Sequence, residues 1–122
     1  SLLAAAFYGY PEIIKLLIKF GADVNARGGH YGMALQAASF RGHEMVVQLL
    51  IDRGADVRAE GGYFGSALEA AACQGHLAVV QLLIEKGADV NVQGGYYRSP
   101  LLAASSGGHE VVVQFLLDQG AD

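Results

Sequence analysis

The sequence predicts an all-α solenoid of stacked helix pairs that are joined by short hairpin-like turns. Three observations support this prediction. The tetrapeptide GADV recurs at Gly21, Gly54 and Gly87, and GAD returns at Gly120, so the pattern repeats every 33 residues. Each repeat holds two helix-length segments that end at glycine, which suits the left-handed residue after a helix. Apolar residues make up 52% of the chain, enough for stacked units to share a core that no single unit could bury.

The repeat divides the whole chain into similar units. Full repeats are expected at 21–53, 54–86 and 87–119, while residues 1–20 match the second part of a repeat and residues 120–122 begin another. No linker or change of composition interrupts the pattern, so we expect a single domain over 1–122. The chain has no initiator methionine, and we expect it to be a piece of a longer protein.

The first helix of each repeat is predicted from segments such as MALQAASFRG, which begins at Met33. Its small residues let a neighbouring helix approach closely, and Gly42 ends it. Ser66 with Glu69 forms a capping box, and Ser99 precedes a proline at the first helical position, a favourable start. Met33 offers no cap, so Met33→Ser is expected to stabilise the protein by about 1 kcal/mol.

The second helix is predicted from HEMVVQLLIDRG and its counterparts. Its apolar residues leave only a narrow polar face, which fits a helix packed on more than one side. The following segment, ADVNARGGHYG, has the Gly, Asn and Asp content of an extended turn. Asp23, Asp56 and Asp89 recur there, and we expect each to bond nearby backbone.

The glycines of RGGHYG, residues 27–32, could suggest a phosphate loop. However, neither GxxxxGK[ST] nor GxGxxG occurs, and the segment recurs as EGGYFG and QGGYYR. A glycine pair that reverses the chain at a hairpin tip explains this repetition better.

The 33-residue period, GADVN, GH..VVQLLI and SPLLAA resemble ankyrin repeats over nearly the whole chain. The usual Thr-Pro-Leu-His opening of that family is eroded, because Leu102 follows Ser99-Pro100-Leu101 in the histidine position. The form GG.YG.ALQAAS is similar to ankyrin arrays common in fungal proteins. The resemblance implies a non-catalytic protein-interaction module that binds its partner on a concave face.

The same resemblance implies that partner contacts lie at the hairpin tips and at the exposed ends of the first helices. The tip positions are Arg27, His30, Tyr31, Glu60, Tyr63, Phe64, Gln93, Tyr96, Tyr97 and Arg98. The helix-end positions are Phe7, Tyr8, Phe40, Arg41, Cys73, Gln74 and Ser106.

Aromatic residues are concentrated at these positions. Nine of the eleven aromatic residues lie there or, for Tyr10, next to them, and Tyr and Arg are frequent at interface hot spots. We expect His30, Tyr63 and Tyr96 to contact a partner. For Tyr31, Phe64 and Tyr97, partner contact and stacking between hairpins both stay open.

Composition and spacing exclude several other functions. The net charge of −4 and only eight scattered Lys and Arg argue against binding nucleic acid or an anionic membrane. His43, His76 and His109 recur in register, but neighbouring helices pack about 8–10 Å apart, too far to share a metal ion. We expect each histidine to bond loop backbone and to hold the angle between its two helices.

Catalysis and cofactor binding are not expected either. Cys73 is the only cysteine, and no base is placed to activate its thiol. A single cysteine suits a reducing compartment, so a cytoplasmic location is expected.

Non-catalytic protein recognition is therefore the predicted function. A structural spacer or self-association segment of a larger signalling protein is the first alternative, and an engineered ankyrin binder scaffold is another. Self-association would use uncapped apolar residues at the two ends of the stack, namely Leu2, Leu3, Ile14, Leu17, Ile18, Val112, Phe115 and Leu116.

Overall fold

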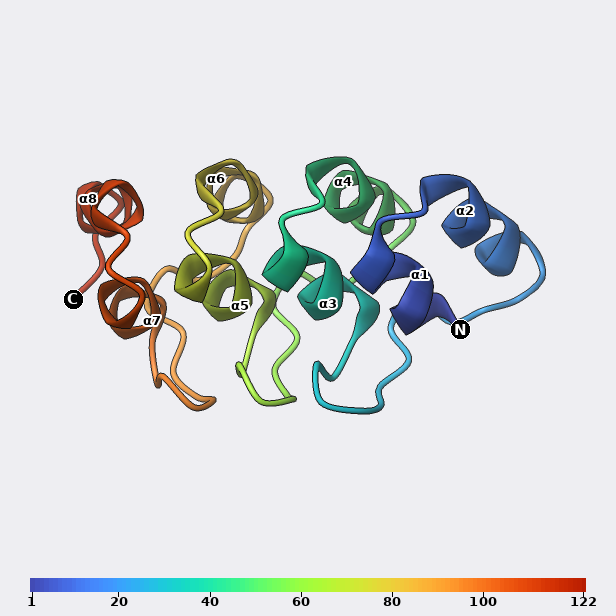
Figure 1. Cartoon of the computed structure of the whole chain (residues 1–122), viewed down its shortest axis with the longest axis horizontal. Coiled ribbons are helices and arrows are strands. Elements are labelled where there is room, and N and C mark those ends of the chain that lie inside the picture. Colours follow the sequence, from blue (N-terminus) through green and yellow to red (C-terminus); the bar gives the residue numbers. More distant parts are fainter.

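A computed structural model describes residues 1–122, and in it the chain forms eight α-helices and no strands. Figure 1 shows how the helices are arranged. The predicted all-α repeat solenoid is confirmed. The helices are α1 (Leu2–Tyr8), α2 (Pro11–Lys19), α3 (Ala34–Arg41), α4 (Glu44–Asp52), α5 (Ala67–Cys73), α6 (Leu77–Glu85), α7 (Pro100–Ser106) and α8 (Glu110–Asp118).

The helices form two layers that run along the stack (Figure 1). The first layer contains α1, α3, α5 and α7, each packed against its neighbours in that order. The second layer contains α2, α4, α6 and α8, and each of these helices packs on the first-layer helix that precedes it. Three hairpins project from the first layer, on the side away from the second layer (Figure 1).

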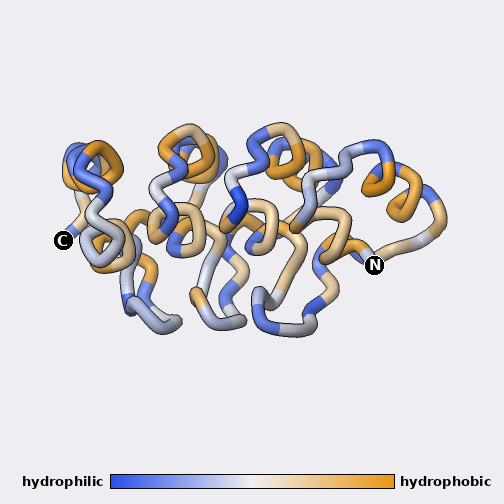
Figure 2. The backbone as a smooth tube through the Cα atoms, viewed as in Figure 1, coloured by the Kyte–Doolittle hydropathy of each residue, from blue (hydrophilic) through white to orange (hydrophobic).

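Small side chains let the first-layer helices pack closely. In α3, which lies between α1 and α5, every residue from Ala34 to Ser39 is buried. The second-layer helices bury a narrower set of residues, and in α4 these are Val46, Val47 and Leu50. Hydrophilic residues lie in the connecting loops, in parts of the hairpins and on the second-layer helices (Figure 2). The core therefore runs without a break from the first repeat to the last.

The predicted helix caps are mostly confirmed. The hydroxyl oxygens of Ser66 and Ser99 accept hydrogen bonds from the backbone N–H groups three residues later, both at 3.2 Å. Ser1 caps α1 in the same way. The capping box differs in one detail: the Ser66 hydroxyl donates to the Glu69 carboxylate at 3.0 Å. Glu69 thus bonds the serine side chain instead of its backbone N–H.

The structure reverses the expectation for Met33. This residue is the N-cap of α3 and makes no side-chain cap, as predicted, but it is only 1% exposed. Met33→Ser would add a cap worth about 1 kcal/mol while removing a buried side chain worth about 2 kcal/mol or more. We therefore expect a loss of about 1–2 kcal/mol in the free energy of unfolding. Chemical denaturation checks this, and an increase in stability would contradict the packing role of Met33.

Asparagine and aspartate connect successive loops. Each predicted turn aspartate accepts a hydrogen bond from the N–H two residues later, as Asp23 does from Asn25 at 2.9 Å. Asn25 also reaches the next repeat, where it donates to the Gly54 carbonyl and accepts from the Asp56 N–H. Asn91 repeats this pair of bonds with Gly120 and Asp122. These bonds between repeats could not be read from one repeat alone.

The predicted apolar residues at the ends of the stack are only partly exposed. Leu2, Ile14, Val112 and Leu116 are less than 10% exposed, whereas Leu3, Leu17, Ile18 and Phe115 are half-buried. More exposed apolar residues were not predicted, and they include Ile13, Leu16, Phe20, Leu102, Val111 and Leu117. No helix has the length and apolar content that a membrane span requires.

Candidate functional site

The three hairpin tips are joined to one another through their backbones. Each hairpin closes on an isolated bridge, such as the one between Gly61 and Gly65. Across the tips, the Tyr63 N–H donates to the His30 carbonyl at 2.8 Å, and the Tyr96 N–H donates to the Tyr63 carbonyl at 2.9 Å. The tips therefore stack in register like neighbouring β-strands.

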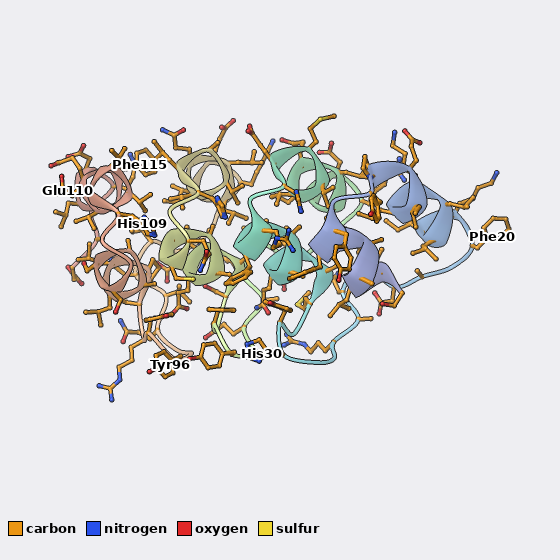
Figure 3. All side chains as sticks on the ribbon, in the orientation of Figure 1. Phe20, His30, Tyr96, His109, Glu110 and Phe115 are labelled. Carbon is orange, nitrogen blue, oxygen red and sulfur yellow. The ribbon has the colours of Figure 1, made fainter.

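This register places the side chains of His30, Tyr63 and Tyr96 in one column, here termed the tip ladder. The His30 and Tyr63 ring centroids lie 4.8 Å apart, and those of Tyr63 and Tyr96 lie 4.9 Å apart. The ring planes differ by only 20° and 16°, so the rings are stacked face to face. Figure 3 shows His30 and Tyr96 at the hairpin tips, away from the helices. Tyr63 and Tyr96 remain 39% and 64% exposed.

A second row of aromatic rings lies between the tips and the first-layer helices. It consists of Phe7, Tyr31, Phe40 and Phe64, whose consecutive ring centroids lie 4.9–5.3 Å apart. Tyr31 also contacts His30 edge to face, and Phe64 contacts Tyr63 in the same way. The two rows form one continuous surface, termed the aromatic surface below, which also takes in Tyr8 and Tyr97 at its margins.

The structure distinguishes among the three aromatic residues whose role was open. Tyr31 and Phe64 stack on each other at 6.0 Å, so both stabilise the hairpins. Phe64 is only 6% exposed, which leaves it too little surface for the partner contact that was predicted. Tyr97 contacts only Tyr96 among the aromatic rings and is half-buried.

Arginine side chains border the aromatic surface. The Arg41 guanidinium lies 4.5 Å from the centre of the Phe7 ring, a cation–π distance. Arg27 donates to the Glu60 carbonyl of the next hairpin. The other predicted polar contacts, Gln74, Gln93 and the Glu60 side chain, are exposed.

Arg98 has an unusual backbone. It is the only residue other than glycine with a positive φ, at 74°, where the first two hairpins have Gly32 and Gly65. A Cβ at Gly65 would lie 2.8 Å from the Gly94 carbonyl carbon of the next hairpin. The Cβ of Arg98 therefore points along the stack, to the place that a following hairpin would occupy. This conformation costs about 1–2 kcal/mol for an L-residue.

The periodic histidines connect repeats, which refines their predicted role. The Nε2–H of His43, His76 and His109 donates to a carbonyl in the preceding repeat, at Phe7, Phe40 and Cys73 respectively, over 2.9–3.0 Å. Each ring is thus tied to the last turn of the preceding first-layer helix and not only to its own loop. Burial lowers the pKa of His76, and the nearby His109 and His43 add to this. The neutral ring is therefore the stable form.

Glu69, in α5, is a buried acid close to Gly65 of the second hairpin. It is fully buried, and its Oε2 has no hydrogen-bond partner. Burial raises its pKa from 4.5 to about 7, although the Ser66 hydroxyl opposes this shift. Gln36 occupies the same position one repeat earlier and is also buried. The fold therefore accepts a neutral polar group at this position.

The stability of the protein is expected to fall as the pH rises from about 4.5 to above 7. Over this range the unfolded chain releases the Glu69 proton while the folded protein retains it, which favours unfolding by about 3 kcal/mol at pH 8. Urea denaturation at several pH values measures the change. The Glu69→Gln variant should lose most of this slope, and an equal slope in both proteins would contradict the assignment.

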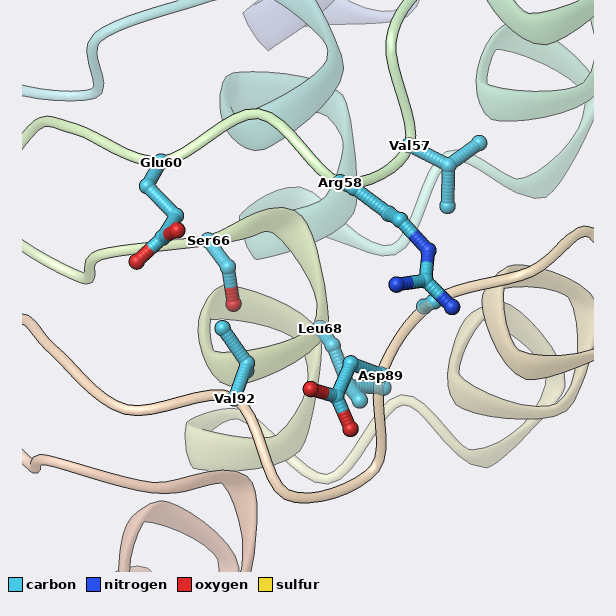
Figure 4. Close-up of a pocket in the computed structure, with 8 residues that line it drawn as sticks. Val57, Arg58, Glu60, Ser66, Leu68, Asp89 and Val92 are labelled. Carbon is cyan, nitrogen blue, oxygen red and sulfur yellow. The ribbon is translucent and has the colours of Figure 1, made fainter.

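Neither the cysteine nor a small cavity between two loops is suited to catalysis. Cys73 is buried and donates to the Ala70 carbonyl, and burial raises its pKa to about 11. Figure 4 shows a cavity between two successive loops, with a volume of about 80 Å³. Ligand pockets usually measure about 300–1,000 Å³. The cavity is lined by Val57, Arg58, Glu60, Ser66, Leu68, Ala88, Asp89 and Val92.

A family model described as ankyrin repeats (3 copies) matches residues 2–94 and 68–122, which together span almost the whole chain. The chain belongs to the ankyrin repeat family. Ankyrin repeats are in general non-catalytic protein-interaction modules. A search of curated proteins finds no match.

The ankyrin fold brings most of the predicted contact residues together. Phe7, Tyr8, His30, Tyr31, Phe40, Arg41, Tyr63, Tyr96 and Tyr97 lie on or beside the aromatic surface. Cys73 is buried, and Arg98 points along the stack, so these two lie apart from it. The sequence placed His30, Tyr63 and Tyr96 at equivalent positions of successive repeats, 33 residues apart. It did not predict that these three rings stack on one another.

Proposed function

We propose that this ankyrin protein is a non-catalytic recognition module whose aromatic surface binds a protein partner. The observation that carries the proposal is the continuity of this surface across three hairpins and the first-layer helices. Its outer residues are exposed although they are aromatic, as Tyr96 is to 64%. Stacking also holds them in one arrangement, which lowers the entropy cost of binding.

Capture experiments with matched variants test this proposal. The protein is immobilised and exposed to extract of the source cell, and retained proteins are identified for three forms. The Tyr63→Ala/Tyr96→Ala variant should lose a partner that the unmodified protein retains, because hot-spot tyrosines typically contribute about 2 kcal/mol or more each. The control variant replaces Met45 and Val111, exposed apolar residues of the second layer that are 78% and 65% exposed. Equal capture by all three forms would contradict the proposal.

Self-association is a second candidate function. Ile13 is 48% exposed, whereas its counterparts Val46, Val79 and Val112 are at most 2% exposed. Leu117 at the other end is also 48% exposed, so one copy could stack on the end of another. Sedimentation over a range of concentrations tests this, with Ile13→Glu as the comparison. A single mass at all concentrations would contradict self-association.

A further inference from the structure

The middle ring of the tip ladder, Tyr63, exposes its edge to solvent. Tyr63 lies between His30 and Tyr96, with stacked neighbours at 4.8 and 4.9 Å on its two faces. An aromatic ring is electron-rich on its faces and electron-poor at its edge. At Tyr63 both faces are covered by neighbours, so a partner meets the electron-poor edge and the hydroxyl group, whereas His30 and Tyr96 each have a stacked neighbour on one face only. The middle of the ladder is therefore suited to carboxylates and carbonyl oxygens, and not to a cation that needs an open ring face.

The hydroxyl group of Tyr63, in the middle of the tip ladder, stays protonated. Burial by the stacked neighbours raises the pKa of Tyr63, and the nearby Tyr96 and Tyr97 raise it further. A neutral phenol donates a hydrogen bond to an ionised carboxylate, which has only acceptors. The ladder therefore offers two phenol hydroxyls to a partner, those of Tyr63 and Tyr96.

Acidic side chains are nearly absent from this side of the molecule. The hairpins and the first-layer helices, with the residues that end them, cover 1–10, 27–42, 60–75 and 93–108. These segments contain only two of the twelve acidic residues, Glu60 and the buried Glu69. They contain three arginines and His30, and of the arginines Arg27 and Arg41 border the aromatic surface, whereas Arg98 lies apart from it. The other ten acidic residues lie elsewhere in a chain of net charge −4.

Resting on the proposed function, we infer that the partner presents an acidic segment, rich in Asp and Glu, to the tip ladder and to Arg41. The guanidinium over Phe7 and the phenol edges of the ladder supply the donors for its carboxylates. The aromatic surface is a strip along the stack and not a closed cavity, so it accommodates a chain segment better than a small molecule. Apolar residues of that segment would pack on the half-exposed rings of the inner row.

Selection from a displayed library of random peptides tests the inference. The unmodified protein is the target, and clones that also bind the Tyr63→Ala/Tyr96→Ala variant are discarded. The remaining clones should be enriched in Asp and Glu relative to the unselected library. The most enriched peptide, made synthetically, should bind about 10-fold more tightly than a copy with its acids replaced by Asn and Gln.

Matched substitutions then identify the donors. Arg41→Glu should weaken binding of that peptide about 10-fold, whereas Arg53→Glu, the same charge change at the end of α4, should change it less than about 2-fold. Tyr63→Phe keeps the stacked ring but removes the hydroxyl, and should weaken binding about 3- to 10-fold. Circular dichroism confirms that each variant is folded.

The possible outcomes separate this inference from the proposed function. The inference is overturned if the selected peptides need Tyr63 and Tyr96 but are not enriched in Asp and Glu, or if Arg41→Glu does not change their affinity. Either result leaves the proposed function standing. A selection that yields no binder specific to the unmodified surface overturns both. Acidic binders that depend on Arg41 and on the Tyr63 hydroxyl support both.

Discussion

Replacing Gly62 by alanine is expected to lower the free energy of unfolding by about 3–4 kcal/mol. Gly62 has a φ of 70°, and a Cβ there would lie 2.6 Å from the Tyr31 carbonyl oxygen and 2.9 Å from the Gly32 nitrogen. These are backbone atoms, so no side-chain rotation relieves the contact. The second hairpin must move away from the first, and the bond between Tyr63 and His30 is lost with it.

A thermal melt followed by circular dichroism measures this effect, which corresponds to a decrease of about 10 °C or more in Tm. Gly28→Ala is the matched control in the neighbouring hairpin. A Cβ at Gly28 would meet nothing within 4 Å, so we expect a change below about 0.5 kcal/mol. Equal effects of the two substitutions would contradict the close approach of the hairpins.

The second large effect is expected at His76, where alanine should cost about 2–3 kcal/mol. The substitution removes the 2.9 Å bond to the Phe40 carbonyl and leaves that carbonyl without its partner. It also removes the ring that packs over Gly42, where a Cβ would lie 2.5 Å from the imidazole. Because the bond joins two repeats, the loss should weaken their coupling as well as the local loop.

Urea denaturation checks this prediction, with His30→Ala as a control on the exposed tip. That control should cost about 1 kcal/mol, since the exposed His30 ring loses contacts with Tyr31, Tyr63 and Phe64 but no hydrogen bond. The pKa of His76 is lowered in the folded protein, so its contribution is present above pH 6.5 and is lost as the pH falls. His76→Ala should therefore reduce the loss of stability in acid. An unchanged acid response would contradict the buried neutral ring.

Features that repeat within a unit were predictable from the sequence, whereas contacts between units were not. The helices, Ser66 and Ser99 as caps, and the turn aspartates depend on local chemistry, and the structure confirms them. The burial of Met33 and the target of His76 depend on how closely the units stack. A 33-residue period shows that units repeat but not the distance or angle between them, so these contacts were missed.

For the candidate site, the sequence predicted the positions of the residues but not the contacts between them. The tyrosine register pointed to the tips, but the backbone bonds that bring Tyr63 and Tyr96 into face-to-face stacking become visible only in the folded chain. Phe64 belongs to the same column of positions as Tyr31 and Tyr97 yet is buried. Its ring contacts Phe40 and Tyr31 of the preceding repeat, which the sequence of one hairpin cannot indicate.

Amide hydrogen exchange of the protein, free and bound to a captured partner, tests most directly whether the aromatic surface is the binding site. Recognition through this surface predicts slower exchange at the hairpin tips around His30, Tyr63 and Tyr96 and at the ends of α1 and α3, with little change in α4 and α6. Protection confined to the second-layer helices, or to the two ends of the stack, would contradict it.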